Sequence, residues 1–178
     1  HRLPAGVLHE FISPLGYLVL RFAPDPTDLR AIWSNHEGGF FRFDDLDAIA
    51  SAGPVHLRIR FSASIRPECF ELVIRGTKGY LRTDLFQPVL IRSVPRMGGS
   101  KVSPIINQFV QGITLARGSV GNFAAKVLDH TPYHGLHRLI AQIYHTLRHG
   151  DEPPVTRRDI ERLASLVDRL IAEQERSS

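Results

Sequence analysis

The feature that most constrains this chain is a change in the period of its apolar residues part-way along it. Apolar and polar residues alternate strictly between Val55 and Ser62, and the pattern returns from Phe70 to Ile74. A period of two is typical of a strand with one buried face and one polar face. From Ser103 onward the apolar residues recur every three or four positions, which indicates helices. Strands and helices are therefore segregated, and we expect an α+β fold: a mostly antiparallel open sheet with helices packed on one face.

Capping residues and local patterns predict the individual elements. A first helix is expected over about 14–23, because Ser13 can cap it and Pro14 suits its first turn. Asp44 is expected to cap a short helix or helical turn in "DDLDAIASAG". Further strands are expected at 29–34, 40–43, 55–62, 70–74, 80–84 and 88–94.

Three helices are expected after the strands. One begins at the pair Ser103–Pro104, and a second ends at Gly150. Thr156 caps the last one, with Asp159 completing a capping box. Its expected buried stripe consists of Ile160, Leu163, Val167, Leu170 and Ile171.

Composition is that of one soluble domain. The 178 residues are 43% hydrophobic, which suffices for one sizeable core. The 22 basic and 18 acidic residues are interspersed, which favours a solvated surface over the basic stripe of a nucleic-acid-binding protein. The most apolar run, "FISPLGYLVLRF", is broken and too short to cross a bilayer. The single cysteine, Cys69, allows no internal disulfide and fits a reducing, cytoplasmic compartment.

The stretch "RGTKGYLRTD" could be a phosphate-binding loop or a turn between strands. A P-loop requires G-x-x-x-x-G-K-[ST] leading into a helix, whereas strand-like residues follow Gly79. The dinucleotide fingerprint G-x-G-x-x-G is absent from the sequence. We therefore expect "GTKG" to be a hairpin turn, and we expect this chain to bind no nucleotide by itself.

Histidines raise the question of a metal site. Four of the nine fall on the predicted helix that ends at Gly150, on the face opposite its apolar stripe: His134, His137, His145 and His149. His145 and His149 stand at i and i+4 and could share an ion. No carboxylate or cysteine stands at a matching spacing on that helix, which favours a solvated polar face. A role for some of these histidines in a cleft remains open.

Two segments, in order, resemble the C-terminal domain of the Gfo/Idh/MocA oxidoreductase family. They are "FELVIRGTKGYLRTDLF" and "YHGLHRLIAQIYHTLRHGDEPPVTRRDIERLASLVDRLI". In that family a strand ends in a G-T-x-G turn, and a helix ends in a G-x-x-P-P-V-T segment before a final helix. The resemblance covers most of the chain and implies an α+β domain that supplies the substrate wall.

The resemblance also implies a partner domain and a substrate class. Family members hold NAD or NADP on an N-terminal Rossmann domain and act mostly on sugars or related polyols. The chain begins at His1, not Met, and lacks the glycine fingerprint. We therefore expect residues 1–178 to be a single C-terminal substrate-binding and oligomerisation domain of a longer protein, using NAD or NADP only through a Rossmann domain outside this chain.

The family's catalytic pair is an acidic residue followed four positions later by histidine, after a G-x-L-like segment. "GVLHEFISP" matches the start of this motif, with Glu10 at the acidic position. Pro14 occupies the histidine position, and proline cannot transfer a proton. The resemblance makes Glu10, with the neighbouring His9, the expected catalytic residue. An alignment shift that brings His9 or another histidine into the histidine role stays open.

We expect the substrate to meet the segment around Ser13, because a helix that starts there would expose backbone donors. Tyr133, His134 and His137 are expected on the opposite wall of the cleft. Catalytic and substrate-binding groups would then come from the two ends of the chain.

The expected partners are a sugar-like small molecule and a second copy of the chain, with neither nucleic acid nor membrane. We expect a homodimer or higher homo-oligomer through the outer face of the sheet, which would present His56, Arg58, Arg60, Val73 and Trp33. One alternative is a catalytically inactive binding or regulatory domain on the same scaffold. A second is an unrelated α+β interaction module.

Overall fold

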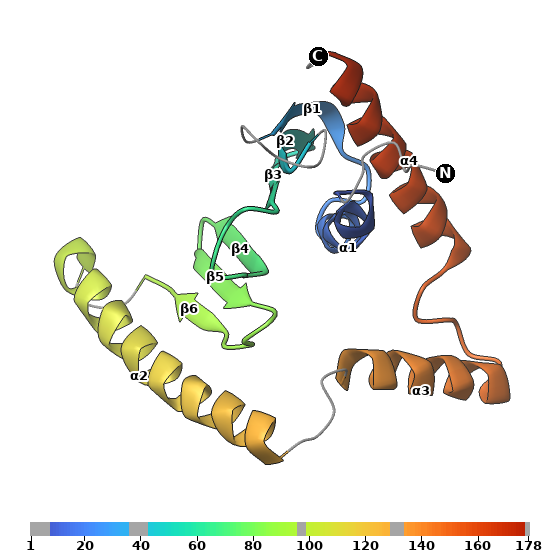
Figure 1. Ribbon diagram of the computed structural model, residues 1–178. Coiled ribbons are helices and arrows are strands. Elements are labelled where there is room, and N and C mark those ends of the chain that lie inside the picture. Colours follow the sequence, from blue (N-terminus) through green and yellow to red (C-terminus); the bar gives the residue numbers. More distant parts are fainter. Residues whose placement is uncertain (1–7, 36–42, 96–98, 129–133, 177–178) are drawn as a thin grey trace. The chain divides into compact units, whose positions relative to one another are not determined.

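The computed structural model describes residues 8–35, 43–95, 99–128 and 134–176 (Figure 1). The helices are α1 (Leu8–Leu20), α2 (Gly99–Leu128), α3 (His134–His149) and α4 (Arg157–Ala172), followed by a 3₁₀ turn, η1 (Glu173–Arg176). The strands are β1 (Thr27–Ser34), β2 (Asp45–Ala52), β3 (Val55–Ser62), β4 (Glu71–Gly76), β5 (Gly79–Asp84) and β6 (Ile91–Ser93). The α+β class and the antiparallel pairing are confirmed, but the strands form two three-stranded sheets where one was expected.

The chain divides into two compact units. The first consists of residues His1–Ile65 and Leu139–Ser178, and the second of Arg66–Arg138. Each unit contains one of the two sheets, in the strand orders β1-β2-β3 and β4-β5-β6.

The first unit is a sheet with two helices, α1 and α4, packed on one of its faces. Alternate residues of the strands point to these helices, as the register of Ala48 opposite Ala31 and Ile59 illustrates. Small alanines on the inner face let the helices approach the sheet closely. The buried core consists of Leu8, Ile12, Leu29, Ala31, Trp33, Leu46, Ala48, Ala50, Ile59, Leu166, Val167 and Leu170.

Helices α1 and α4 also pack against each other at a glycine. A Cβ atom built on Gly16 would lie 2.8 Å from Cδ1 of Leu163 and 3.4 Å from Cδ2 of Leu166. Glycine therefore permits the close contact between the two helices. Most of the apolar run "FISPLGYLVLRF", which includes Gly16, lies in helix α1 and packs on this core.

Helix α1 begins earlier than the sequence predicted. It runs from Leu8 to Leu20 and contains Pro14 in its interior, so Ser13 is not its N-cap. Proline in a helix interior removes a hydrogen bond and costs about 3 kcal/mol. Leu8 and Ile12, both fully buried, offset that cost, since burying each such side chain contributes about 1.5–3 kcal/mol. Tertiary burial overrides the local capping signal.

Strand β2 replaces the short helix that was predicted after Asp44. It is the central strand, paired with β1 on one side and β3 on the other. Leu46, Ala48 and Ala50 face the core, while Ile49 is exposed. Alanine and aspartate are poor strand formers, so local propensity pointed away from a strand here. The buried residues nevertheless recur at every second position, as in a strand.

The second unit contains the hairpin predicted from "GTKG". Gly76 pairs with Gly79 across a two-residue turn between β4 and β5. Gly79 has φ +132°, and a Cβ atom there would clash with the carbonyl oxygen of Ser93 on β6. Glycine is therefore required both by the turn and by the neighbouring strand. The prediction of a hairpin is confirmed.

Helix α2 lies along β6 and presents its smaller, more polar side to the sheet. Asn107 Nδ2 donates a hydrogen bond to the carbonyl oxygen of Val94 over 2.8 Å, and Gln111 Nε2 donates to the hydroxyl of Tyr80 over 3.1 Å. Gly118 lies against Val89. The helix begins at Gly99, so the predicted start at Ser103–Pro104 is wrong and Pro104 lies inside it.

The C-terminal helices begin and end close to the predicted positions. Gly150, with φ +72°, ends α3, and its N–H donates to the carbonyl oxygen of Thr146 over 2.8 Å. Thr156 and Asp159 form the predicted capping box of α4. Ile160 is 58% exposed, so its predicted place in the buried stripe is wrong.

The predicted strand 40–43 falls largely outside the described residues. No helix within the described ranges is both long enough and apolar enough to cross a bilayer.

Candidate functional site

Glu10, the expected catalytic acid, lies in the first turn of α1 and is exposed. The adjoining His9 belongs to the same helix. Because this segment is helical, Glu10 and Pro14 stand one turn apart on the same side of α1. The prediction that the first helix begins near residue 14, which leaves His9 and Glu10 outside it, is therefore wrong.

The expected substrate-binding residues are distributed over both units. Ser13 lies in the middle of α1 and is half-buried, and its backbone is part of the helix instead of an exposed helix start. Tyr133 lies outside the described residues. His134 is the first residue of α3, and His137, in its first turn, is exposed. Glu10 and Ser13 belong to the first unit, and His134 and His137 to the second.

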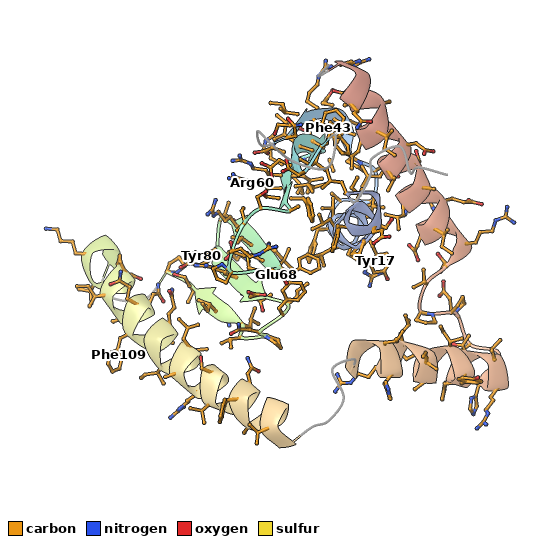
Figure 2. All side chains as sticks on the ribbon, in the orientation of Figure 1. Tyr17, Phe43, Arg60, Glu68, Tyr80 and Phe109 are labelled. Carbon is orange, nitrogen blue, oxygen red and sulfur yellow. The ribbon has the colours of Figure 1, made fainter. Side chains whose placement is uncertain are left out.

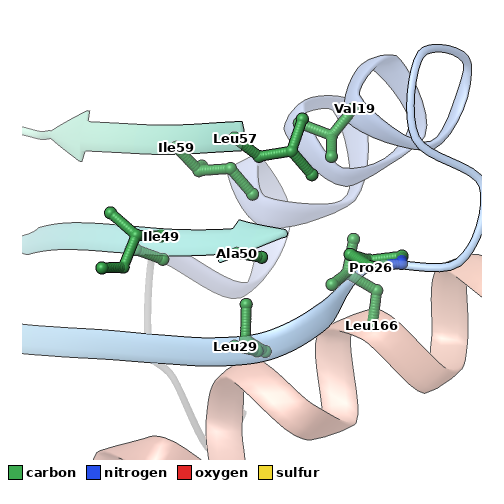
Figure 3. Close-up of a pocket in the computed structure, with 9 residues that line it drawn as sticks. Val19, Pro26, Leu29, Ile49, Ala50, Leu57, Ile59 and Leu166 are labelled. Carbon is green, nitrogen blue, oxygen red and sulfur yellow. The ribbon is translucent and has the colours of Figure 1, made fainter. Parts of the chain in front are cut away.

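A pocket in the first unit is lined only by apolar side chains (Figure 3). It lies between the sheet, α1 and α4. Its lining residues are Val19, Pro26, Leu29, Ala48, Ile49, Ala50, Leu57, Ile59 and Leu166. A sugar needs hydrogen-bonding partners for its hydroxyl groups, so this pocket belongs to the packed core and not to a sugar site.

The face of this sheet turned away from the helices carries charged residues. Arg58 donates from Nε to Oδ1 of Asp47 over 3.0 Å, and a second bond joins its Nη2 to Oδ2. This side-chain hydrogen bond from Arg58 holds the pKa of Asp47 below its usual range, against a smaller opposing effect of burial. His56, Arg58 and Arg60 are exposed there, as expected.

Two residues expected on that face lie elsewhere. Trp33 is only 3% exposed and points into the core. Val73 is on β4, in the other sheet. Exposed apolar area on the outer face of the first sheet comes instead from Ile32 and Ile49, which are 67% and 55% exposed.

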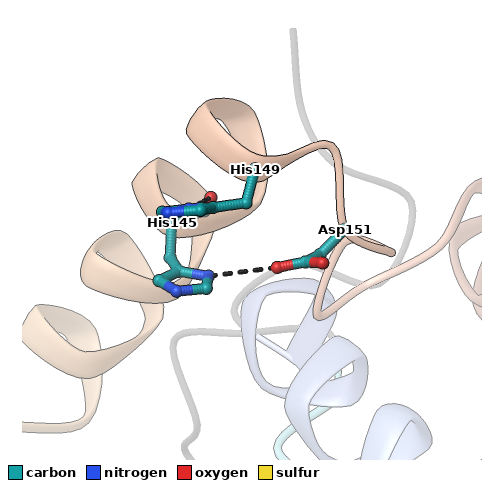
Figure 4. A group of neighbouring side chains, drawn as sticks. All are labelled: His145, His149 and Asp151. Carbon is teal, nitrogen blue, oxygen red and sulfur yellow. Dashed lines mark hydrogen bonds and ion pairs between the residues drawn. The ribbon is translucent and has the colours of Figure 1, made fainter.

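A cluster of possible metal ligands lies at the C-terminal end of α3 (Figure 4). It consists of His145, His149 and Asp151, each offering one donor atom, and these atoms lie within 4.8 Å of one another. His145 Nδ1 and Asp151 Oδ2 are 3.2 Å apart. The rings of His145 and His149 stack with centroids 4.2 Å apart. All three residues are exposed.

The sequence pointed to only part of this cluster. The spacing of His145 and His149 was visible, but a carboxylate was sought on the helix itself. Asp151 lies just beyond the helix, and the positive φ of Gly150 turns the chain so that its carboxylate comes back to His145. A search that included the residues after a predicted C-terminal glycine would have found it.

The hydrogen bonding of His149 fixes which ring nitrogen is available. Its Nδ1 lies 2.9 Å from the carbonyl oxygen of His145. A carbonyl can only accept, so Nδ1 carries the hydrogen and the lone pair of the neutral ring is on Nε2. This is the arrangement that commonly orients a histidine for metal binding.

The G-T-K-G segment does not have the local structure of a dinucleotide-binding loop. A nicotinamide cofactor would need a glycine-rich strand-to-helix turn, and the sequence has no such fingerprint. The G-T-K-G segment joins two strands instead. Comparisons with protein-family models, curated proteins and solved structures gave no match to this chain.

Proposed function

We propose that this chain is the substrate-facing and oligomerising domain of a cytoplasmic NAD(P)-dependent oxidoreductase of the Gfo/Idh/MocA type, acting on a sugar or polyol. One observation carries the proposal: the two segments that resemble this family adopt the local structures its motifs require. Gly76–Gly79 is a tight hairpin turn, and the residues after Gly150 lead into a helix capped by Thr156. Such features support a shared scaffold more directly than a shared reaction.

Within this proposal, Glu10 is the residue of the chain that handles a proton. It is exposed in the first turn of α1, where a carboxylate can accept a hydrogen bond from a substrate hydroxyl. The nicotinamide cofactor, which accepts or delivers the hydride, would be bound by a Rossmann domain outside this chain. Contacts of the substrate hydroxyl groups with Ser13, Tyr133, His134 and His137 stay a prediction from the sequence.

The test is NAD(P)-linked turnover of a panel of sugars and polyols by the full-length protein. Glu10→Gln should lower kcat by ~10²-fold or more, the scale of a positioned acid–base group. Glu161→Gln, a change of an exposed carboxylate on α4, serves as the matched control and should leave kcat unchanged. Intact turnover in Glu10→Gln combined with loss in His134→Ala would transfer the role to the α3 histidines.

A catalytically inactive binding or regulatory domain is the second candidate. Pro14 favours it, because this residue occupies the position of the family's histidine and lies inside a helix with one buried face. The discriminating result is saturable binding of a sugar or polyol without turnover. That outcome would also explain why a residue unable to transfer protons is tolerated there.

Self-association through the outer face of the β1–β3 sheet is part of the proposal. The face presents Arg58, Arg60 and His56 around the exposed Ile32 and Ile49. A closed symmetric dimer is the commonest arrangement for such a surface. Arg58→Glu should weaken the association measured by light scattering. If the variant and the unaltered protein have the same mass at every concentration, this face is removed from the proposal.

A further inference from the structure

We propose that His145, His149 and Asp151 form a binding site for a divalent transition-metal ion of the zinc type. The proposal is independent of the oxidoreductase function. It rests on the geometry of the three side chains at the end of α3 (Figure 4).

The donor atoms need only side-chain rotation to surround one ion. A tetrahedral zinc with ligands at about 2.0–2.2 Å holds neighbouring donor atoms about 3.3–3.6 Å apart. His145 Nδ1 and Asp151 Oδ2, which form an ion pair at 3.2 Å, already come close to this spacing, and an ion bound between them would displace the proton that they share. One donor atom of each residue lies within 4.8 Å of the other two, and the side chains are exposed, so side-chain rotation can bring in the third ligand.

The backbone supports the carboxylate that completes the site. Gly150 donates its N–H to the carbonyl oxygen of Thr146, which fixes the turn after the helix. Thr146 Oγ1 in turn donates to the carbonyl oxygen of Glu152 over 3.5 Å. These two bonds bracket Asp151 and hold its position next to the last turn of α3.

Two features at this position favour a cation and act against the positive charge of Arg148 in the same turn. The carbonyl groups at a helix C-terminus carry a partial negative charge, and His149 is the last residue of α3. The carboxylate of Asp151 adds a full negative charge. The hydrogen bond from His149 Nδ1 to the His145 carbonyl leaves Nε2 available to ligate.

The chemistry of the donors selects the class of metal. Two imidazoles and one carboxylate suit zinc, copper(II) and nickel(II), whereas calcium and magnesium prefer oxygen ligands throughout. Three protein ligands leave a fourth tetrahedral position for water. The site therefore leaves one coordination position of the metal free for another ligand.

The test is calorimetric titration of the protein with Zn²⁺ in a chelator-free buffer at neutral pH, repeated with Co²⁺ and followed by its visible absorption. We expect one equivalent to bind to the unaltered protein. His149→Ala and Asp151→Asn should each weaken this binding by tenfold or more, and the Co²⁺ spectrum should lose its tetrahedral bands.

His137→Ala, a change of an exposed histidine on the same helix, is the matched control and should leave the affinity for Zn²⁺ unchanged. Unchanged affinity in His149→Ala, or an equal loss in His137→Ala, would overturn the proposal. Circular dichroism should show each variant folded as the parent, because the altered side chains are exposed.

A second inference rests on the outward side of α2. Its apolar residues follow an unbroken alternation of three and four positions: Val102, Ile106, Phe109, Ile113, Ala116, Val120, Phe123 and Val127. We call these residues the α2 seam. Asn107, Gln111 and Gly118, which face the sheet, lie on the opposite side of the helix. Figure 2 shows Phe109 on the side away from β6 and Tyr80 on the side of the sheet.

The α2 seam has the spacing of a coiled-coil interface. Positions a and d of a heptad repeat carry apolar residues that pack into a facing helix. Phe109, Val120 and Phe123 are 70%, 70% and 71% exposed. The sequence of this helix contains three charged residues, Lys101, Arg117 and Lys126, so few charges would have to be desolvated.

We infer that the α2 seam pairs with the α2 seam of a second copy, in antiparallel orientation. Ala116 stands at the middle of the seam, with Phe109 one heptad before it and Phe123 one heptad after it. A two-fold axis close to Ala116 sets the small side chains of the two copies together and brings each Phe109 near the partner's Phe123. From the exposed fractions of the seam residues we estimate that pairing buries roughly 700 Å² per chain, close to the ~800 Å² per partner of a standard interface.

Sedimentation of the chain over a concentration series tests this inference. The series is run in an Arg58→Glu background, which removes any association through the β1–β3 sheet in the other unit. We expect a dimer in this background, and we expect Phe109→Glu and Phe123→Glu each to convert it to a monomer.

Gln108→Glu is the matched control, because it places the same charge beside Phe109 at an exposed position outside the seam. It should leave the dimer intact. A monomer at high concentration in the Arg58→Glu background, a dimer unaffected by both phenylalanine changes, or an equal loss in Gln108→Glu would overturn the inference.

A cross-link reports on the orientation. In a Cys69→Ser background, Ala116→Cys should form a covalent dimer on mild oxidation, because an antiparallel two-fold axis places this residue beside its own copy. Lys101→Cys, near one end of α2, should not. Cross-linking of Lys101→Cys with no reaction of Ala116→Cys would exclude the antiparallel pairing.

Discussion

The indole nitrogen of Trp33 donates a hydrogen bond over 3.0 Å to the carbonyl oxygen of Leu170, joining strand β1 to the last turn of helix α4. Carbonyl groups in the last turn of a helix lack intrahelical partners. Trp33 thus fills the core of the first unit and satisfies one of these carbonyls. A residue of strand β1 thereby holds helix α4 against the sheet.

Removing this bond should destabilise the first unit. Trp33→Phe keeps an aromatic ring but leaves the Leu170 carbonyl without its indole donor, at a cost of about 1–3 kcal/mol. Thermal unfolding followed by circular dichroism measures the effect. Ile32→Ala changes the adjacent residue on the exposed face and should shift stability by no more than about 0.5 kcal/mol. Equal effects of the two changes would contradict the role assigned to Trp33.

The capping box of α4 should make stability sensitive to acid. Hydrogen bonds from the backbone N–H and then the hydroxyl of Thr156 hold the pKa of Asp159 below its usual value. A lowered folded-state pKa stabilises the protein above the unfolded value of about 3.9, and this contribution is lost as the pH falls through the folded value. Asp159→Asn should flatten the stability profile in that acid range, as measured by unfolding at a series of pH values.

Loss of the cap itself should be visible at neutral pH. Thr156→Ala removes the hydroxyl that accepts from the Asp159 N–H, and such changes cost about 1 kcal/mol. Ser165→Ala, on the exposed side of α4, is the control and should be nearly neutral. Tryptophan fluorescence reports on the first unit alone, because Trp33 is the single tryptophan of the chain.

Among the described glycines of the second unit, Gly79 should tolerate replacement least. Alanine there would be forced to φ +132° with its Cβ against the Ser93 carbonyl, which we expect to cost about 2 kcal/mol or more. Gly121→Ala, in α2 with open space around it, should instead stabilise the helix by about 0.5–1 kcal/mol. Hydrogen exchange of the β5 and β6 amides measures the first effect. Undiminished protection in Gly79→Ala would contradict the tight packing of the hairpin against β6.

Pro14→Ala should raise the stability of α1. The replacement restores an N–H that can bond to the carbonyl of Glu10 and removes the ring from the helix interior, a gain of up to about 3 kcal/mol. Pro24→Ala, in the connection after α1, should have little effect. The measurement is chemical unfolding followed by tryptophan fluorescence. Destabilisation by Pro14→Ala would show that proline stabilises the start of this helix, as the sequence alone had suggested.

Local chemistry was sufficient to predict several parts of the structure. The β3 alternation, the G-T-K-G hairpin, the end of α3 at Gly150 and the cap at Thr156 depend on backbone geometry and on partners within a few residues. The pair His145 and His149 was visible for the same reason, since helical spacing alone brings i and i+4 together.

Tertiary contacts decided the rest. Burial of Leu8 and Ile12 extends α1 through Pro14, and pairing on both edges turns the alanine-rich β2 into a strand, although local propensity favours another answer in each case. The turn at Gly150 places the Asp151 carboxylate next to His145, and helical spacing alone does not predict this contact. Sequence by itself determined the β3 alternation, the hairpin turn and the cap of α4, which depend on residues close together in the chain. Which faces became buried, and how strands divided between two sheets, depended on contacts between residues far apart in the chain, because burial of apolar surface outweighs local preferences of a few kcal/mol.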